Sequence, residues 1–259
     1  MLPIKKIYID SRFMSSDSRN ESDFKIDLPI TIHLPEDTVF YLDDICIPVS
    51  WYTVDEERNN KFYFRIGATD YVKTIPAGNY STTTLNTKLV ELMNTVNSVF
   101  SPSPNLPTNT VGISTSGSAT FEILTDRQII DLDYAVPVQS INNYLNNNIP
   151  KINSSANPYI SGYVNLNPVR NIFITSGNLG GYNTLSISGE RGIIKKVPVR
   201  ANYNELIYDD AVLGIDYLTC SRQSLSRLEF QLKDMYGNFI NLHGNHWSFS
   251  IVFAKMKED

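Results

Sequence analysis

The chain has 259 residues and a formal net charge of −5, so it is long enough to bury a sizeable core. Hydrophobic residues make up 42% and charged residues 19% of the sequence, as in a globular protein. The negative charge argues against specific nucleic-acid binding, because phosphate neutralisation requires a basic surface. No apolar run approaches the roughly 18 residues needed to cross a bilayer, so we expect no membrane span.

Neither the cysteines nor the first residues indicate secretion. Cys46 lies in an apolar strand pattern, far in sequence from Cys220, so no disulfide framework is indicated. The opening MLPIKKIYID contains no long apolar stretch. We therefore expect a protein that is synthesised and kept in the reducing interior of a cell and not secreted through a signal peptide.

Alternating apolar and polar residues predict β-strands in the first part of the chain. The alternation runs through 24–28 and 62–66, as in strands that bury one face and expose the other. The segment TVFYLDDICIPV, residues 38–49, is apolar on both faces and predicts an inner strand. We expect the apolar residues of 24–28 and 62–66 to contribute to one sandwich core.

A helix and several loops are predicted for the middle of the chain. One apolar stripe with helical spacing consists of Leu85, Leu89, Leu92, Met93 and Val96. With N-caps available in the Ser/Thr cluster at 81–84, the stripe predicts a helix over about 84–97. A weaker helix is predicted near 140–148. Closely spaced prolines predict a loop at 101–110, and 154–162 is a second predicted loop.

Strand patterns return in the last third of the chain. The candidates are 172–175, 193–199, 228–232 and 247–253. Strands, then a helix with loops, then strands again is the order of a β-sandwich interrupted by an insertion. We expect one domain over 1–259, with 68–160 as an inserted subdomain or an elaborated connection.

Two of the three histidines, His243 and His246, stand three residues apart in INLHGNHW. A zinc site needs three or four ligands, and neither His33 nor a Cys-x-x-Cys pair completes a set. Because a strand pattern follows, the segment predicts a turn and a strand start, with His246 on the serine-bearing face of that strand. We expect no bound metal, and elemental analysis of protein purified without chelator tests this.

The acidic pairs are predicted to be structural. They are Asp43–Asp44, Glu56–Glu57 and Asp209–Asp210. Neighbours on a strand point to opposite faces, so Asp43 and Asp44 are not expected to face one substrate together. We expect solvated or turn positions for these carboxylates.

Two other clusters also favour structural roles. The glycine-rich tract 176–192 lacks the Lys-Ser/Thr ending of a phosphate-binding loop and is expected to be a long loop. The basic run Lys195, Lys196 and Arg200 predicts a solvated edge strand, which could touch an acidic neighbour. The sequence also lacks the G-x-S-x-G nucleophile elbow.

Long segments of the chain resemble a known family. They are KIYIDSRFMSSDSRNESDFKIDLP, LPEDTVFYLDDICIPVSWYTVDEERNNKFYF, TIPAGNYSTTTLNTKLVELMN, ISGYVNLNPVRNIFITSGNLG, SGERGIIKKVPV and RLEFQLKDMYGNFINLHGNHWSFSIVF. In this order they resemble the minor capsid, or penton, proteins of Polinton (Maverick) elements and virophages. The resemblance covers most of the chain, and the loops at 101–118 and 149–158 carry little of it.

The resemblance implies a mainly β protein, a single jelly-roll sandwich with a loop- and helix-containing insertion or elaborated connection. It implies a homopentamer at the five-fold vertices of an icosahedral virion, among trimers of a double jelly-roll major capsid protein. The family has no known catalytic residues. We therefore expect no enzyme activity, no cofactor and no small-molecule substrate.

Jelly rolls also occur in lectins and in cupin enzymes, so the fold alone does not decide the function. The alternative is a carbohydrate-binding β-sandwich attachment module, which an exposed aromatic platform would favour. A cupin-type metal enzyme needs a His-x-His core, which is absent from the sequence.

Overall fold

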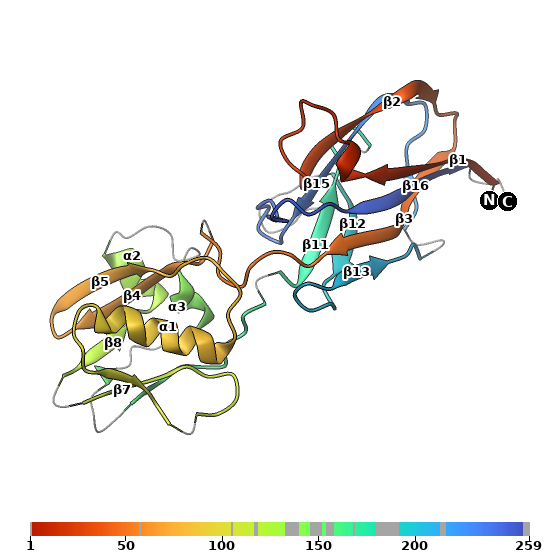
Figure 1. Ribbon diagram of the computed structural model, residues 1–259. Helices are drawn as coiled ribbons and strands as arrows, with labels where there is room; N and C mark the ends of the chain where they lie inside the picture. The colour runs from red at the N-terminus through yellow and green to blue at the C-terminus, as the bar shows by residue number, and fades with distance from the viewer. Residues whose placement is uncertain are drawn as a thin grey trace. The chain divides into compact units, whose positions relative to one another are not determined.

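A computed structural model divides the chain into two units, each with its own core (Figure 1). Unit 1 comprises residues 1–51 and 169–259, and unit 2 comprises residues 52–168. The structure describes residues 2–56, 58–104, 106–116, 119–132, 140–145, 152–153, 158–167, 169–179, 192–212 and 216–255.

Unit 1 is built from two antiparallel sheets. Sheet A has the strand order β1-β16-β3-β13, with the short β14 paired to β3, and sheet B has the order β12-β11-β15-β2. The elements are β1 (Leu2–Asp10), η1 (Ser11–Phe13), β2 (Asp23–His33), β3 (Thr38–Pro48), β11 (Asn171–Thr175), β12 (Ile193–Pro198), β13 (Leu206–Asp209), β14 (Leu218–Thr219), β15 (Ser224–Lys233) and β16 (Ser248–Lys255).

The pairing of these strands is that of a jelly roll. Apart from β14, the described strands of unit 1 follow one another as β1, β2, β3, β11, β12, β13, β15 and β16. In sheet A, the first strand (β1) pairs with the eighth (β16), and the third (β3) pairs with the sixth (β13). In sheet B, the second strand (β2) pairs with the seventh (β15), and the fourth (β11) pairs with the fifth (β12). This wrapping over two sheets confirms the predicted fold class.

Inward-facing apolar side chains from both sheets form the core of unit 1. On β15, Leu228, Phe230 and Leu232 are fully buried, and their alternation with polar residues is the reason that the segment forms a two-faced strand. The ring of Phe230 meets Phe249 of β16 edge to face, with ring centroids 4.7 Å apart. The predicted burial of strands 228–232 and 247–253 is therefore confirmed. Residues 38–49 also behave as predicted, because β3 lies inside sheet A between β16 and β13.

Unit 2 has two smaller sheets and three described helices. The strand orders are β5-β4-β8-β9 and β10-β7-β6. The elements are β4 (Lys61–Ile66), β5 (Thr69–Thr74), α1 (Thr82–Asn94), β6 (Phe100–Pro102), β7 (Gly112–Thr115), β8 (Phe121–Ile123), α2 (Asp126–Asp131), α3 (Ile141–Tyr144), β9 (Ile152–Asn153) and β10 (Tyr159–Ile160).

Helix α1 confirms the main helix prediction, with shifted ends. Ser81 is its N-cap and forms a reciprocal capping box with Thr84. The helix ends at Asn94, three residues before the predicted end, where the Asn94 side chain hydrogen-bonds both the amide and the carbonyl of Phe100. These two bonds hold the following chain in position to begin β6. The short α3 lies within the predicted weaker helix at 140–148.

The strand at 62–66 was placed in the wrong core by the sequence pattern. It forms β4 of unit 2, where Phe62 and Phe64 are fully buried with the α1 stripe. Tyr63, on the other face of β4, is also buried, against Leu124 and Ile129. Alternation shows that a strand has a buried face, but it does not show which core that face enters. The predicted subdomain 68–160 lies within unit 2, which extends from 52 to 168.

Two predicted loops contain short strands. Phe100–Pro102 pairs with β7 at the edge of its sheet, a position where proline is tolerated because no partner needs its missing amide. Tyr159–Ile160 pairs with the other edge of β7. Within the described residues, no helix combines the length and apolar character needed to span a bilayer.

Candidate interaction surface

The outer face of sheet A presents polar and aromatic side chains in cross-strand rows. One row is Asp10, Ser248, Cys46 and Tyr208, from β1, β16, β3 and β13. The next is Tyr8, Ser250 and Asp43. We call the part of this surface that carries Tyr8, Asp43, Asp44, Tyr208 and Asp210 the acidic face.

Two tyrosines stand out from the edges of the acidic face. The exposed fraction is 78% for Tyr8 on β1 and 73% for Tyr208 on β13. The inner strands between them carry the short side chains of Ser248, Ser250 and Cys46. Burial raises the pKa of the Cys46 thiol, although a hydrogen bond from Tyr208 acts in the opposite direction. On the acidic face, short side chains in the centre are thus flanked by the exposed aromatic rings of Tyr8 and Tyr208 at the two edges.

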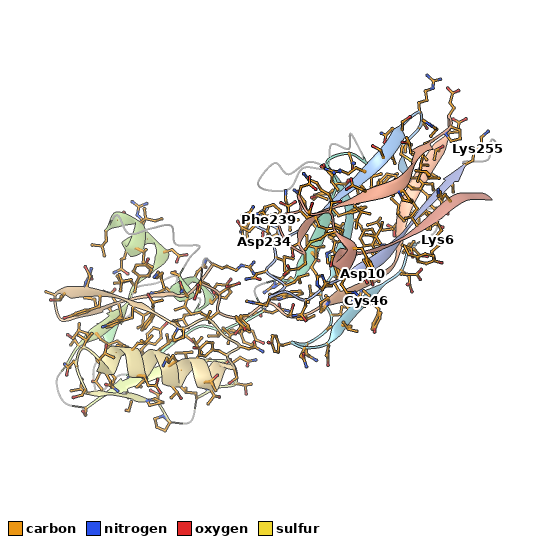
Figure 2. The ribbon with its side chains drawn as sticks, turned by 45° about the horizontal axis from the view of Figure 1, so that its top comes forward. Lys6, Asp10, Cys46, Asp234, Phe239 and Lys255 are labelled. Carbon is orange, nitrogen blue, oxygen red and sulfur yellow. The ribbon has the colours of Figure 1, made fainter. Side chains whose placement is uncertain are left out.

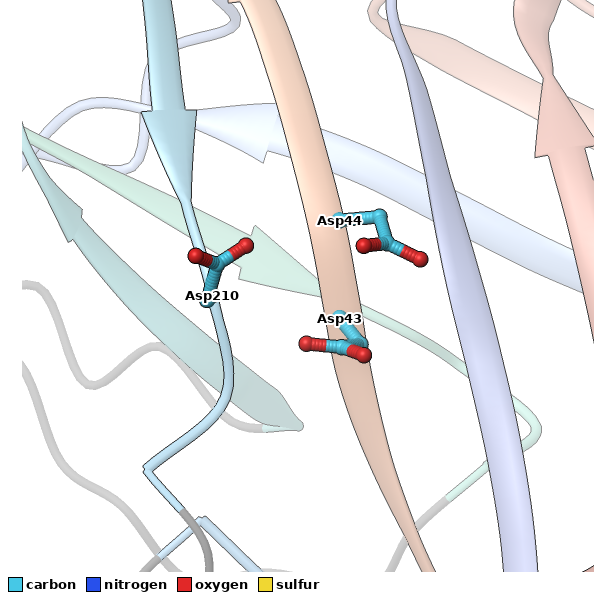
Figure 3. Close-up of side chains that lie close together, drawn as sticks. All are labelled: Asp43, Asp44 and Asp210. Carbon is cyan, nitrogen blue, oxygen red and sulfur yellow. The ribbon is translucent and has the colours of Figure 1, made fainter.

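Three carboxylates gather on this face, and two of them were predicted to point apart. Oxygen atoms of Asp43, Asp44 and Asp210 all lie within 4.8 Å of one another (Figure 3). The prediction was wrong because β3 bulges here. Ser248 pairs with Cys46 but Ser250 pairs with Asp43, and Asp44 has a left-handed φ of 51°. The extra residue cancels the usual alternation and turns both carboxylates outward.

Lys6 lies beside this cluster. Its Nζ lies 2.6 Å from Asp44 Oδ2 and 3.8 Å from Asp43 Oδ2. The hydrogen bond with Asp44 raises the pKa of Lys6 and lowers that of Asp44. Asp43 also accepts a hydrogen bond from the Ala211 amide. Three carboxylates against one ammonium leave the cluster with an excess of negative charge.

Among the residues that the structure describes, Asp43, Asp44 and Asp210 form the one set of carboxylate, histidine or cysteine side chains that lie close enough together to hold a metal ion. Exposed carboxylates often gather without an ion, and an ammonium group already lies among these. The expectation that the protein binds no metal remains a prediction.

The basic run at 195–200 is only partly solvated. Lys196 and Arg200 are exposed, and β12 is an edge strand as predicted. Lys195, however, is 8% exposed, and its Nζ lies 3.1 Å from Asp209 Oδ2 and 2.7 Å from Asp216 Oδ2. Burial acts to lower the pKa of Lys195, but hydrogen bonds to Asp216 and Asp209 outweigh it and leave the pKa raised. Lys195 therefore connects sheet B to the end of β13 in sheet A and to the chain that follows it.

The histidine segment has the predicted turn and strand start. His243 lies in a turn with φ 51°, and its amide donates to Asn241 Oδ1. His246 Nδ1 lies 3.0 Å from the hydroxyl of Ser11, which also accepts from the Trp247 amide. These contacts join the end of β1 to the start of β16. His33 pairs instead with Ser224.

Parts of several predicted features lie outside the described residues. They are Glu57, residue 105 of the first predicted loop, 146–148 of the weaker helix, 154–157 of the second predicted loop and 180–191 of the glycine-rich tract. The described Asn178 binds the carbonyl of Arg227 and the amide of Glu229. An open polar hollow beside it is lined by Asn178, Gln223, Ser224, Leu225, Ser226, Arg227 and Glu229.

The exposed tyrosines were missed in the sequence, although a signal was present. In IYID at 7–10 and LIYD at 206–209, an aromatic residue occupies a position that alternation assigns to the solvent. A large aromatic side chain there is a feature of interaction surfaces.

No protein-family model matches the sequence, and no curated protein matches it. Among solved structures, the fold is similar to that of the selenomethionine-labelled mavirus penton protein, with a TM-score of 0.54 and 11% sequence identity. The similarity covers 97% of this chain and 100% of that chain. At 11% sequence identity the similarity shows a shared fold. At the level of the fold, it confirms the predicted resemblance to a penton protein.

Proposed function

We propose that this protein is a structural capsid protein that forms the pentameric vertices of an icosahedral particle. The observation that carries the proposal is the likeness to the mavirus penton protein over nearly the full length of both chains. The likeness spans both the jelly roll of unit 1 and the residues of unit 2. A shared single domain would have been a weaker argument, because isolated jelly rolls serve many functions.

The surface of unit 1 supports a role in assembly. Tyr8 and Tyr208 are large aromatic side chains held on strands and exposed to solvent. Tyrosine is enriched at the energetic centres of protein interfaces because it contributes a large apolar area at a low entropy cost. In a closed ring, each subunit presents one patch to a different patch on its neighbour.

The partners follow from the proposal. Five copies form the vertex, and trimers of a double jelly-roll major capsid protein surround them. The protein resides in the virion, its role is structural and not enzymatic, and its source is a virophage or a Polinton-type element.

Two measurements test this function. Light scattering of the purified chain over a range of concentrations should give a pentamer mass. Co-expression with a double jelly-roll major capsid protein should place the chain at particle vertices in electron micrographs. A strict monomer that is also absent from the vertices would reject the proposal.

The carbohydrate-binding alternative has one observation in its favour, the same exposed tyrosines. Sugars stack on exposed aromatic rings, so a glycan array separates the two functions. Glycan binding by the monomer that is lost in both Tyr8→Ala and Tyr208→Ala would favour the attachment module. Assembly without glycan binding would favour the capsid protein.

A further inference from the structure

A row of alternating cations and aromatic rings crosses the outer face of sheet B. Lys196 pairs across strands with Phe173, and Phe173 pairs with Lys233. Lys233 in turn forms a β-bridge with Phe239, and the guanidinium of Arg19 lies over the Phe239 ring. We call Lys196, Phe173, Lys233, Phe239 and Arg19 the basic strip.

The strip has a defined geometry. Arg19 Cζ lies 5.1 Å and Lys233 Nζ 5.4 Å from the centroid of the Phe239 ring, so the ring contacts two cations. Arg19 and Lys196 are exposed at its two ends, and Phe173 is half-buried.

The acidic face and the basic strip lie on opposite sides of one sandwich. The first is on the outer face of sheet A and the second on the outer face of sheet B. In Figure 2, Lys6, Asp10 and Cys46 lie together along one side of unit 1, apart from Phe239. One chain therefore carries an excess of carboxylates on one side and a row of cations on the other.

We propose that the acidic face of one copy of this chain docks on the basic strip of the next copy. The inference rests on the proposed vertex function and identifies the two surfaces that meet in the ring. Charge complementarity selects a second copy as the occupant, because each copy supplies both members of the contact. Such a contact is heterologous, as a closed ring of more than two subunits requires.

The size of the surface is compatible with this contact. Four strands spaced by about 4.8 Å, with about 3.3 Å per residue along each strand, give sheet A a face of roughly 500 Å². Two such surfaces together reach about 1,000 Å², the lower bound for a specific interface. The projecting rings of Tyr8 and Tyr208 fit a row in which cations alternate with Phe173 and Phe239, because tyrosine packs well against both.

Charge reversal at exposed residues tests the docking. Asp210→Arg changes the acidic face and Arg19→Glu changes the basic strip, at opposite edges of the sandwich. Across a docked contact each change opposes like charges, so we expect the concentration at half-assembly to rise about tenfold or more. The double variant Asp210→Arg/Arg19→Glu restores opposite charges and should return to within about threefold of the wild type.

The controls have the same charge changes on a different surface. Glu36→Lys and Arg222→Glu alter an exposed ion pair at the turns that precede β3 and β15, away from both faces. We expect no change in assembly. As an uncharged second test, Tyr8→Ala should weaken assembly about thirtyfold, the effect of losing an aromatic anchor. Far-UV circular dichroism establishes that each variant is folded.

The outcomes distinguish this inference from the vertex proposal. If the wild type forms pentamers and both single reversals assemble equally well, the docking is wrong and the vertex function stands. If Asp210→Arg by itself assembled more strongly than the wild type, the acidic faces of two copies would be in contact with each other, and the proposed docking would be wrong. A wild-type monomer that is absent from vertices would reject both. Oligonucleotide binding lost in Arg19→Glu, with assembly unchanged, would assign the strip to nucleic acid.

Discussion

Lys195 joins the two sheets of unit 1 near their β12–β13 edge. Its ammonium group is held by Asp209 and Asp216, and it also donates to the carbonyl of Asp210. An ammonium taken out of water is costly unless it is paired and hydrogen-bonded, which is the case here. In the sequence, Lys195 looks the same as its exposed neighbour Lys196, because a run of lysines does not show which side chain turns inward.

We expect Lys195→Met to lower the free energy of unfolding by about 2–3 kcal/mol at neutral pH, less than for a fully buried pair because both carboxylates are partly exposed. The pKa of Asp216 is lowered, so its contribution to stability is present above the ordinary aspartate value and is lost as pH falls through the lowered value. The pKa of Lys195 is raised, so its contribution is lost as pH rises through the raised value.

Urea denaturation across pH measures this difference. The gap between wild type and Lys195→Met should be largest between about pH 5 and pH 10 and should narrow on both sides. Lys196→Met is the matched control, and its effect should stay within about 0.5 kcal/mol. An equal effect of the two substitutions would mean that the ion pair does not stabilise the fold.

Phe249 is the centre of the aromatic packing in unit 1. It is stacked on Trp247 and meets Phe230 edge to face, with both ring-centroid distances at 4.7 Å. Phe249→Ala should cost about 3–5 kcal/mol, from lost burial and the cavity that remains. Tryptophan fluorescence in urea measures this, because Trp51 and Trp247 both lie in the core of unit 1. Phe13→Ala, at a side chain that is 77% exposed, should have little effect.

At the scale of elements, the bulge in β3 determines which side chains the acidic face displays. Without it, Asp43 and Asp44 would alternate between the core and the solvent. The bulge restores the inward direction for Ile45 and Ile47, which are both buried, so the core is not disturbed. One inserted residue therefore adds a carboxylate to the surface and leaves the hydrophobic register on each side intact.

The left-handed backbone at Asp44 can be tested by substitution. Asp44→Val should be less stable than Asp44→Gly by about 1–2 kcal/mol, because a β-branched side chain clashes at positive φ. At Asp10, where φ is −139°, valine suits the strand and the order should reverse. Denaturation of the four variants measures both differences. Greater stability of Asp44→Val than Asp44→Gly would contradict the bulge.

Much of the secondary structure was predictable, and the misses have physical causes. The helix α1 and the strands at 228–232 and 247–253 were found because their apolar periodicity is long. Helix α2 is only six residues, so it has almost no periodicity, yet its capping box of Thr125 and Gln128 was a detectable signal. The bulge at Asp44 was not predictable, because aspartate is only one of several residues that tolerate positive φ.

At the scale of the whole molecule, the two units have separate cores. The core of unit 2 is formed by side chains between Val54 and Val164, all from one continuous segment. The core of unit 1 combines side chains from both sides of that segment. The jelly-roll class was predictable from the order of strand patterns and from the family resemblance. The extent of unit 2 was not, because β4 and β5 have the same pattern as sandwich strands.

We expect residues 52–168 to fold when expressed alone. Their core residues, including Phe62, Leu89 and Phe121, are buried by contacts within the same segment. Circular dichroism should show helix and strand signals and a cooperative thermal transition. Both tryptophans lie in unit 1, so fluorescence cannot report on this fragment. A gradual, non-cooperative melt would show that unit 2 depends on unit 1.

The jelly-roll pairing also determines the order in which the protein can fold during translation. Strand β1 pairs with β16, and Ile7 lies opposite Ile251. When β1, β2 and β3 leave the ribosome, the partners that will cover their apolar faces have not been synthesised. Unit 2 is complete before β11 is made, and domains generally fold as units during synthesis. The helix-containing unit is thus the first part of the nascent chain that can fold, and the sandwich closes only after β16 has emerged.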